Sequence, residues 1–233
     1  MTIRLKNRIG VLLIMLVWLA FPLSASAAEH VLVIDPAHGG EDTGVNLSRG
    51  VHEKDVTLAI ASLMKKNLSD TADIQVRLTR PEDRDVSATQ RKKIIGGADV
   101  DLVISLHVNA GFGQNAAGYE VYYLGATIPS ARKDDSREIL KDMEQTRRLN
   151  SSVLFAQIVQ KNMERVFPRK GRGLRNAPVY LLRSLITPAI LLEMGFSTDI
   201  EDRRKLRDKK VQESVANALT RSVTEYFSTG GTS

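Results

Sequence analysis

The chain contains no cysteine among its 233 residues, so neither a disulfide framework nor a thiolate metal site is possible. Stability must therefore come from a hydrophobic core, and a chain of this size can bury roughly 70% of the surface that it exposes when unfolded. Aromatic residues make up only 5% of the chain, and its single tryptophan is Trp18. No repeat, Ser/Pro-rich linker or low-complexity tract marks off a second domain. The composition thus predicts one domain stabilised by its core.

Long apolar runs are also missing, with one exception at the N-terminus. Three basic residues precede an apolar run over residues 9–20, and the small residues Ala25-Ser26-Ala27 follow it. This order is typical of a secretory signal peptide, so we expect residues 1–27 to be removed. The run is too short to span a bilayer comfortably. We therefore expect an exported catalytic domain, residues 28–233, located in the periplasm, with secretion or wall association as the alternatives.

A strong excess of one charge is absent once the signal peptide is removed. The chain carries 33 basic and 27 acidic residues, and the signal peptide takes away three basic and no acidic ones, so the net charge falls from +6 to +3. No basic cluster alternates with aromatic residues, which argues against nucleic-acid binding. No Gly-x-Ser-x-Gly motif occurs, which argues against a serine hydrolase.

What the sequence does contain is an alternation of short apolar strands with helical patterns. We expect strands at residues 31–34, 74–78, 102–106, 120–124 and 189–192, and helices at about 54–68, 87–95, 136–166 and 208–226. The alternation predicts a single α/β domain with a twisted, mostly parallel central sheet and helices on both faces. Ligands in such folds collect at the carboxyl ends of the strands.

Two of the four histidines follow predicted strands. His38 follows the first strand in Asp35-Pro36-Ala37-His38-Gly39-Gly40, and His107 follows the third in Ser105-Leu106-His107-Val108-Asn109. Both histidines should therefore face the same edge of the sheet. Two histidines and one carboxylate, with the fourth position left for water, form a common catalytic zinc set.

The third ligand should be an acidic residue brought near by the loop after His38. Glu53, at the start of the next helix, projects close to the apolar face of that helix, and so, less closely, does His52. Glu41 and Asp42 are the rivals. Glu53 is equally well explained as a first-turn carboxylate stabilised by the helix dipole, so the residues alone leave the choice open.

One acidic residue lies in a stretch that must be buried. Glu193 ends the apolar run Pro188-Ala189-Ile190-Leu191-Leu192. It is either half of a buried ion pair, with an arginine such as Arg183, or a general base beside the metal. An apolar setting raises the pKa of a carboxylate toward neutrality, which suits a group that accepts a proton from water and passes it to a leaving nitrogen.

Six segments resemble the zinc-dependent N-acetylmuramoyl-L-alanine amidases that turn over bacterial cell walls. They occur in family order over nearly the whole of residues 28–233: VLVIDPAHGGEDTG (31–44), EKDVTL (53–58), VRLTR (76–80), ADVDLVISLHVNA (98–110), GYEVYY (118–123) and PAILLEMGFSTDIEDRRKL (188–206). The resemblance implies hydrolysis of the amide bond between N-acetylmuramic acid and L-alanine in peptidoglycan, for wall turnover or daughter-cell separation.

The resemblance also implies roles for individual residues. His38, Glu53 and His107 hold one zinc ion per chain, and Glu193 is the catalytic carboxylate that shuttles the proton. The family's Glu-Lys pair is present as Glu53-Lys54, which places Glu53 ahead of its rivals.

Other polar residues near the predicted site are expected to be structural. Asp35 is expected to cap the loop or to orient an imidazole, and Asn109 is expected to cap a turn or loop, with a substrate contact as the alternative. Arg80 and Arg91 are expected to satisfy carbonyls or carboxylates, although contact with stem-peptide carboxylates is the alternative. His30 is expected to be inert.

The charged stretch over residues 128–152 has two interpretations. Ile139, Leu140 and Met143 form one weak apolar stripe, which fits a solvated helix that extends the next one. Some relatives are held inactive by a helix inserted here until an activating partner binds, so the stretch is alternatively a regulatory helix packed near the site. Unchanged wall degradation after deletion of residues 130–148 would exclude autoinhibition.

Two other functions use similar residues. A metal-dependent deacetylase of wall glycans needs a similar ligand set, and only the family segments argue against it. A non-catalytic peptidoglycan-binding module does not need a buried carboxylate such as Glu193 beside a metal. The expected partners are peptidoglycan and, under the regulatory interpretation, an activator protein, and the chain is expected to be a monomer.

Overall fold

The computed structural model describes residues 30–71, 73–111, 116–125, 136–168, 170–183 and 185–230. The predicted signal peptide and the first part of the 128–152 stretch lie outside the described residues. The elements follow in the order β1 (His30–Pro36), β2 (Asn46–Ser48), β3 (Val51–His52), α2 (Glu53–Asn67), β4 (Ile74–Leu78), α3 (Ala88–Ile95), β5 (Leu102–Asn109), β6 (Tyr119–Tyr123), α4 (Ser136–Met163), β7 (Gly171–Asn176), β8 (Ala189–Phe196), α5 (Ile200–Arg207) and α6 (Lys209–Ser228). In the part of the chain so described, no helix is long and apolar enough to cross a membrane.

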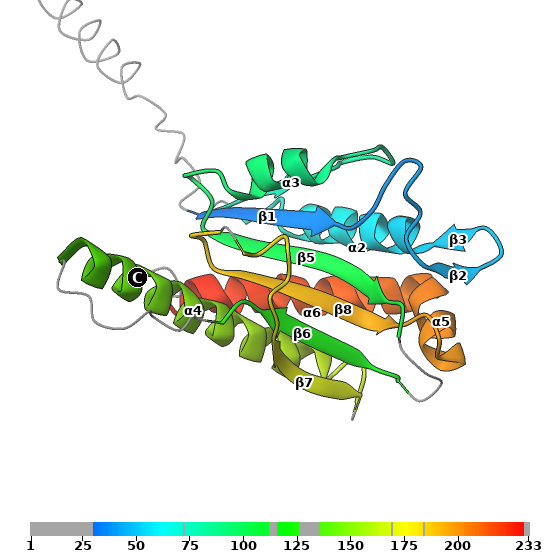
Figure 1. Ribbon diagram of the computed structural model, residues 1–233. Helices are drawn as coiled ribbons and strands as arrows, with labels where there is room; N and C mark the ends of the chain where they lie inside the picture. Colours follow the sequence, from blue (N-terminus) through cyan, green and yellow to red (C-terminus); the bar gives the residue numbers. More distant parts are fainter. Residues whose placement is uncertain are drawn as a thin grey trace, which may run out of the picture.

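A six-stranded sheet with the order β4-β1-β5-β8-β6-β7 forms the centre of the fold (Figure 1). Strands β4, β1, β5 and β8 run parallel, β6 is antiparallel to β8, and β7 is parallel to β6. The inner strands β1, β5 and β8 are rich in Val, Ile and Leu and are buried along almost their whole length. Strands covered on both faces have this composition. The predicted α/β fold with a mostly parallel sheet is confirmed.

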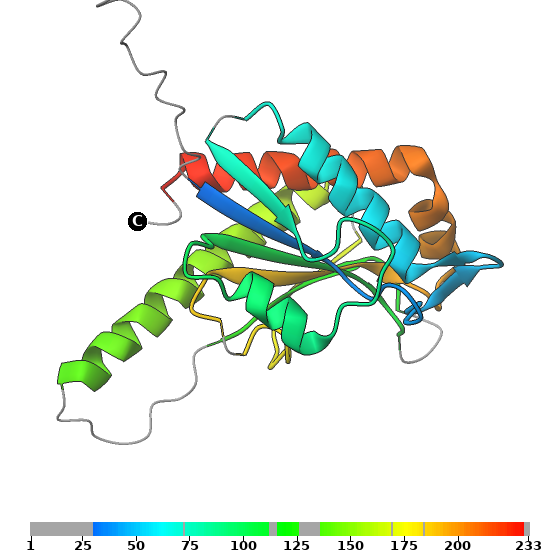
Figure 2. The same ribbon diagram turned by 90° about the horizontal axis from the view of Figure 1, so that it is seen from above.

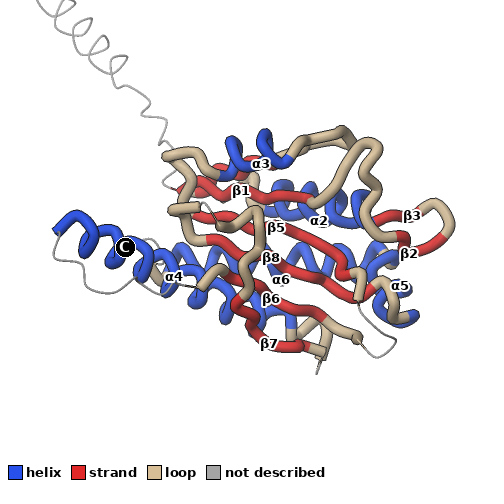
Figure 3. Tube along the Cα trace, in the orientation of Figure 1, coloured by secondary structure: helices blue, strands red, loops and turns tan. Residues whose placement is uncertain are grey.

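Helices cover the two faces of the sheet unequally (Figures 2 and 3). Helices α2, α4 and α6 pack on one face and form the larger core with it. The other face carries α3 and residues 177–183 and 185–187, which form a smaller core. The strand residues of this smaller core are Val31, Val33, Val103, Ala189 and Leu191.

The face under α3 becomes polar toward the carboxyl ends of the strands. Side chains two residues apart in a strand point to the same face. The next positions on this face are Asp35 in β1, Ser105 and His107 in β5, and Glu193 in β8. Because the apolar cover ends before these positions, this end of the face is where polar chemistry can be placed.

Three elements were not predicted from the sequence: the β2–β3 hairpin, β7 and α5. Strand β7 has the sequence Gly-Arg-Gly-Leu-Arg-Asn, which lacks apolar alternation, and it forms by pairing with the edge that β6 offers. Strands β5 and β8 also extend further than expected. His107 and Glu193 therefore lie inside strands, and the prediction that His107 comes just after a strand was wrong.

Residues 136–152 form the first part of α4 and are continuous with its remainder. The apolar residues of the predicted stripe are largely exposed: Ile139 53%, Leu140 60% and Met143 62%. Glu144 of the same helix lines a cavity with Pro188, the residue before β8. This part of α4 therefore lies at the amino ends of the parallel strands, as a solvated extension of the helix (Figure 1). Regulation by an activator protein stays a prediction.

Candidate metal centre

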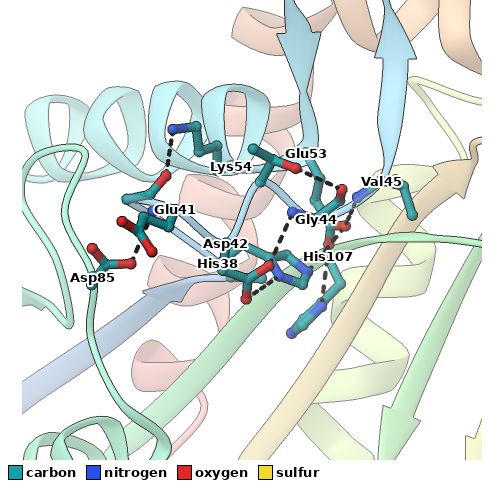
Figure 4. A network of polar contacts seen from close by, with 12 residues as sticks. His38, Glu41, Asp42, Gly44, Val45, Glu53, Lys54, Asp85 and His107 are labelled. Atoms are coloured by element: carbon teal, nitrogen blue, oxygen red, sulfur yellow. Dashed lines mark hydrogen bonds and ion pairs between the residues drawn. The ribbon is translucent and has the colours of Figure 1, made fainter.

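His38, Glu53 and His107 come together at the carboxyl ends of β1 and β5 (Figure 4). One ligand atom from each lies within 4.8 Å of the other two. Glu53 lies between the imidazoles, with Oε2 3.1 Å from His38 Nε2 and Oε1 3.3 Å from His107 Nδ1. Of the residues that the structure describes, no other His, Cys, Asp or Glu side chains form such a group. The rivals Glu41 and Asp42 are thus outside it.

Glu53 is held in place by the fold itself. It is the first residue of α2 and is 1% exposed. Its carboxylate oxygens accept hydrogen bonds from the backbone N–H groups of Val45 at 3.0 Å and Val108 at 2.9 Å. Burial raises the pKa of Glu53, but hydrogen bonds from His107 and His38 outweigh burial and lower the pKa to about 2. The carboxylate is therefore ionised at neutral pH.

His38 lies in a loop of unusual backbone conformation. Its φ is 59°, in the left-handed region that residues other than glycine rarely adopt, and Gly39 and Gly40 continue the loop with positive φ. Its Nδ1 lies 2.8 Å from Asp42 Oδ2, which leaves Nε2 facing Glu53. The hydrogen bond with Glu53, opposed by burial and supported by Asp42, raises the pKa of His38 to about 9. Without a metal, His38 is therefore protonated at pH 7.

Two arginines fix the carbonyl groups of this loop. Arg80 is fully buried and donates to the carbonyls of Pro36 at 3.0 Å and Ala37 at 2.9 Å. Arg91 donates to the carboxylate of Asp35 at 2.6 Å and to the backbone carbonyl of the first site histidine. The predicted structural role of both arginines is confirmed, and their engagement inside the fold removes them as contacts for a substrate carboxylate.

Asp35 supports the arginine and not an imidazole. Its carboxylate accepts hydrogen bonds from Thr79 Oγ1 at 2.5 Å, Arg91 at 2.6 Å and Ser105 Oγ at 2.7 Å. The prediction that Asp35 orients an imidazole was therefore wrong. Asp42, which the sequence presented only as a rival ligand, takes that position instead.

The remaining polar candidates have structural partners. Asn109 accepts a hydrogen bond from the backbone N–H of Gly111 at 2.9 Å, which confirms the predicted turn cap. His52 is the N-cap of α2 and lies outside the three-residue group. His30 stacks on Phe227 with a centroid separation of 4.2 Å, far from the site at the other end of β1.

Glu193 lies beside the metal centre, as the register partner of His107 on the neighbouring strand. Its Oε2 is buried and has no hydrogen-bond partner in the described structure. Arg183, the suggested ion-pair partner, donates instead to a backbone carbonyl at 3.0 Å. Burial, together with the negative charges of nearby carboxylates and against the opposing charge of His107, raises the pKa of Glu193 to about 7. Such a carboxylate can both accept and return a proton near neutral pH.

A cavity of about 520 Å³ opens beside the two histidines. Residues of β1, the start of α3 and the segment 179–181 line it, and Asp85 and Ser87 are among them. The candidate metal centre is therefore accessible from solvent through a cleft on the α3 face.

The model of a family described as N-acetylmuramoyl-L-alanine amidase, Amidase_3, matches residues 32–225. The chain belongs to this amidase family. AmiA of Escherichia coli K12 is 29% identical over 225 residues, which cover 87% of this chain and 78% of AmiA. CwlM of Bacillus licheniformis is 30% identical over 197 residues, which cover 84% of this chain and 68% of CwlM. The family resemblance seen in the six segments is confirmed.

Solved structures of such amidases share the fold. An N-acetylmuramoyl-L-alanine amidase from Clostridium difficile 630 superposes with a TM-score of 0.70 at 30% identity, covering 87% of this chain and 98% of that one. AmiC2 of Nostoc punctiforme gives a TM-score of 0.72 at 28% identity, covering 87% and 99%. The amidase described here is thus an α/β domain of the same architecture.

The sequence did not reveal every residue around the site of this amidase. Glu120 stands in the segment Gly-Tyr-Glu-Val-Tyr-Tyr, where a charge inside an apolar strand was a usable signal. Arg172 and Arg175 lie in β7, which the sequence pattern did not predict at all. All three lie near Glu193, because β6 pairs with β8 and β7 pairs with β6.

The donor set fits a zinc ion. Imidazole nitrogen and carboxylate oxygen are ligands that zinc prefers, and three of them leave the fourth tetrahedral position for water or substrate. Ligand atoms about 2.0–2.2 Å from a tetrahedral zinc lie roughly 3.3–3.6 Å from one another. Each imidazole nitrogen lies near that spacing from a different oxygen of Glu53, at 3.1 Å for His38 and 3.3 Å for His107, and one atom from each of the three residues lies within 4.8 Å of the other two.

Asp42→Asn is expected to weaken zinc binding by the amidase about tenfold, because the carboxylate that orients His38 is lost. Competition with a fluorescent chelator measures the zinc affinity. Glu41→Gln is the matched control, since it removes a neighbouring negative charge without touching His38, and it should leave the affinity unchanged. Equal losses in both variants would show that only the local charge matters.

Proposed function

We propose that this amidase holds one zinc ion with His38, Glu53 and His107 and uses Glu193 as its catalytic carboxylate. Its substrate is the amide bond between N-acetylmuramic acid and L-alanine in peptidoglycan. The observation that carries the assignment of roles is the buried, unpartnered Oε2 of Glu193 beside a cluster of two histidines and one carboxylate. The family match over residues 32–225 supports the substrate.

A zinc ion bound by these residues supplies a Lewis acid that polarises the amide carbonyl and lowers the pKa of water toward about 7. Glu193 accepts a proton from the attacking water while the water oxygen bonds to the carbonyl carbon. Glu193 then returns the proton to the amide nitrogen as the carbon–nitrogen bond breaks. Burial raises the pKa of Glu193 above its ordinary value, which suits both transfers near neutral pH. The products are a free muramic acid carboxylate and a peptide with a free N-terminus.

The fold keeps the reacting groups in register. Glu193 and His107 are paired positions on adjacent strands, whose backbones lie about 4.8 Å apart. Glu53 is fixed by two backbone N–H groups and His38 by Asp42, so the imidazoles need little rearrangement to bind a metal. This preorganisation keeps the proton acceptor within reach of water at the metal centre.

We propose further that residues 28–233 act in the periplasm. The basic, apolar and small-residue pattern of residues 1–27 supports export. The substrate supports it too, because peptidoglycan lies outside the cytoplasmic membrane. N-terminal sequencing of the protein from a periplasmic extract checks the cleavage after Ala27.

The product of wall digestion tests the proposed function. Residues 28–233, loaded with zinc, are incubated with purified peptidoglycan, and the soluble products are analysed by mass spectrometry. We expect free stem peptides that begin with L-alanine. Released acetate would identify a deacetylase, and intact peptidoglycan would leave either an autoinhibited enzyme that lacks its activator or a wall-binding module.

A further inference from the structure

Two arginines of β7, Arg172 and Arg175, share a single carboxylate, that of Glu120. Arg172 Nε donates to Glu120 Oε1 at 2.9 Å, and Arg175 donates to the same oxygen at 3.3 Å. The side chain of Glu120 is 7% exposed, whereas the two arginine side chains are 37% and 48% exposed. Each guanidinium has five N–H donors. The cluster therefore keeps one net positive charge and several donors that face solvent.

Strand register places this cluster next to Glu193. Glu120 and Glu193 are paired positions on β6 and β8, and paired positions point to the same face of a sheet. The guanidinium of Arg172 lies 5.2 Å from the ring centroid of Phe196, at the end of β8. Since β7 is two strands from β8, the arginines are on the order of 10 Å from the catalytic carboxylate.

The two sides of the metal centre differ in charge. The cavity toward α3 is lined by the acidic side chains of Asp42 and Asp85, and the arginine that lines it, Arg91, is bound to Asp35. On the β7 side, Glu120 is paired with both arginines, which leaves one of their positive charges uncompensated. An anionic part of the substrate is therefore attracted to β7 and disfavoured in the cavity.

Glu120 stays ionised under its two arginines. Burial raises its pKa, but the hydrogen bond from Tyr122 and the charges of Arg172 and Arg175 outweigh burial and lower the pKa below its usual value. Glu120 thus positions both guanidinium groups, but its single negative charge balances only one of their two positive charges.

We propose that Arg172 and Arg175 form a carboxylate-binding subsite for the peptide arm of the substrate. This inference rests on the proposed function. The stem residue after L-alanine is joined through its γ-carboxyl group, so its α-carboxylate is free. Two extended residues span about 7 Å, which is of the same order as the roughly 10 Å between Glu193 and the arginines of β7. Guanidinium groups bind carboxylates with strong, directed hydrogen bonds.

Two soluble substrates that differ only in this group test the subsite. One is an N-acetylmuramoyl peptide with a γ-linked D-glutamate after L-alanine, and the other carries the α-amide in its place. We expect kcat/KM of the unaltered enzyme to be about tenfold higher for the carboxylate, the size of one charge-assisted hydrogen bond. The double variant Arg172→Gln/Arg175→Gln should lose this preference through KM, so that its kcat/KM becomes equal on the two substrates.

Two further variants keep the test informative. Arg175→Gln alone leaves the 2.9 Å hydrogen bond between Arg172 and Glu120. It should lower the preference for the carboxylate substrate from about tenfold to about threefold. Arg77→Gln is the control, because Arg77 pairs with Asp99 at the other edge of the sheet and should keep the full preference.

Other outcomes separate the subsite from the proposed function. Equal kcat/KM of the unaltered enzyme on both substrates would overturn the subsite and leave the amidase activity standing. A loss of activity by equal factors on both substrates in the variants would show that the arginines only hold Glu120, and it would also overturn the subsite. Failure of the unaltered enzyme to cleave either substrate would contradict the proposed function itself.

Discussion

Glu193→Gln is expected to lower kcat on peptidoglycan by about 10²- to 10⁴-fold, because an amide cannot shuttle the proton between water and the leaving nitrogen. The substitution preserves the size of the side chain, and Glu193 is not one of the three clustered ligands, so the zinc content should not change. Release of L-alanine peptides measures the activity, and atomic absorption measures the metal. Activity within threefold of the unaltered enzyme would remove Glu193 from the reaction.

The pH dependence of the unaltered enzyme follows from the same group. In the proposed mechanism the base form of Glu193 is the active one, so kcat/KM should fall as the pH drops through the pKa of this carboxylate. That pKa is about 7 in the metal-free protein, and a nearby divalent cation lowers it by favouring the ionised form. The acidic limb is therefore expected below pH 7. It should be missing from the residual activity of Glu193→Gln.

A stability measurement separates this catalytic role from a structural one. The pKa of Glu193 in the fold lies above its ordinary value of 4.5, so the group stabilises the fold fully below pH 4.5 and that stability is lost as the pH rises toward about 7. Above about pH 7 the ionised, buried carboxylate lowers the free energy of unfolding, and replacing it with an amide removes that loss. The midpoint of thermal unfolding of metal-free Glu193→Gln at pH 8 should not fall below that of the unaltered protein, and exposed Glu201→Gln is the control. A lower midpoint would indicate a structural role.

The sequence predicted those parts of the fold that local patterns encode. Strands β1, β5 and β8 were recognisable because both of their faces are buried, which leaves continuous runs of Val, Ile and Leu. Strand β7 was not recognisable, because Gly-Arg-Gly-Leu-Arg-Asn carries no such run and owes its conformation to the neighbouring edge of β6. The antiparallel direction of β6 relative to β8 likewise depends on tertiary contacts and not on a local sequence pattern.

The candidate site also has some residues that the sequence could place and others that it could not. His38 and His107 could be placed by their strands, and the structure brings them together as expected. The choice of Glu53 could not be made from local physics, because it depends on the backbone N–H groups of residues 45 and 108 that approach from other segments. The exchange of roles between Asp35 and Asp42 has the same cause. Partners that are distant in sequence, Arg91 and Ser105, hold Asp35 away from the imidazoles, whereas Asp42 meets His38 only four residues away, through the conformation of the loop.

Glu53→Gln is expected to weaken zinc binding about a hundredfold or more and to abolish detectable wall hydrolysis at limiting zinc. A four-ligand zinc site is worth roughly 10–16 kcal/mol, so one ligand contributes about 3 kcal/mol, which is more than a hundredfold in affinity. The replacement keeps the shape of the side chain but removes the charge that lies between His38 and His107. Glu41→Gln again serves as the control, and an affinity loss below about threefold in Glu53→Gln would exclude Glu53 as a ligand.

The pH dependence of zinc binding gives this variant a second signature. His38 has a pKa of about 9 in the metal-free protein, chiefly because of its hydrogen bond with Glu53, and a metal must displace that proton. The zinc affinity of the unaltered protein should therefore rise about tenfold per pH unit from pH 7 to about 9. In Glu53→Gln the pKa of His38 moves back toward its ordinary value of 6.5, because its largest cause is gone. The slope above pH 7 should then flatten, whereas a substitution that merely loosened the loop would lower the affinity and leave the slope unchanged.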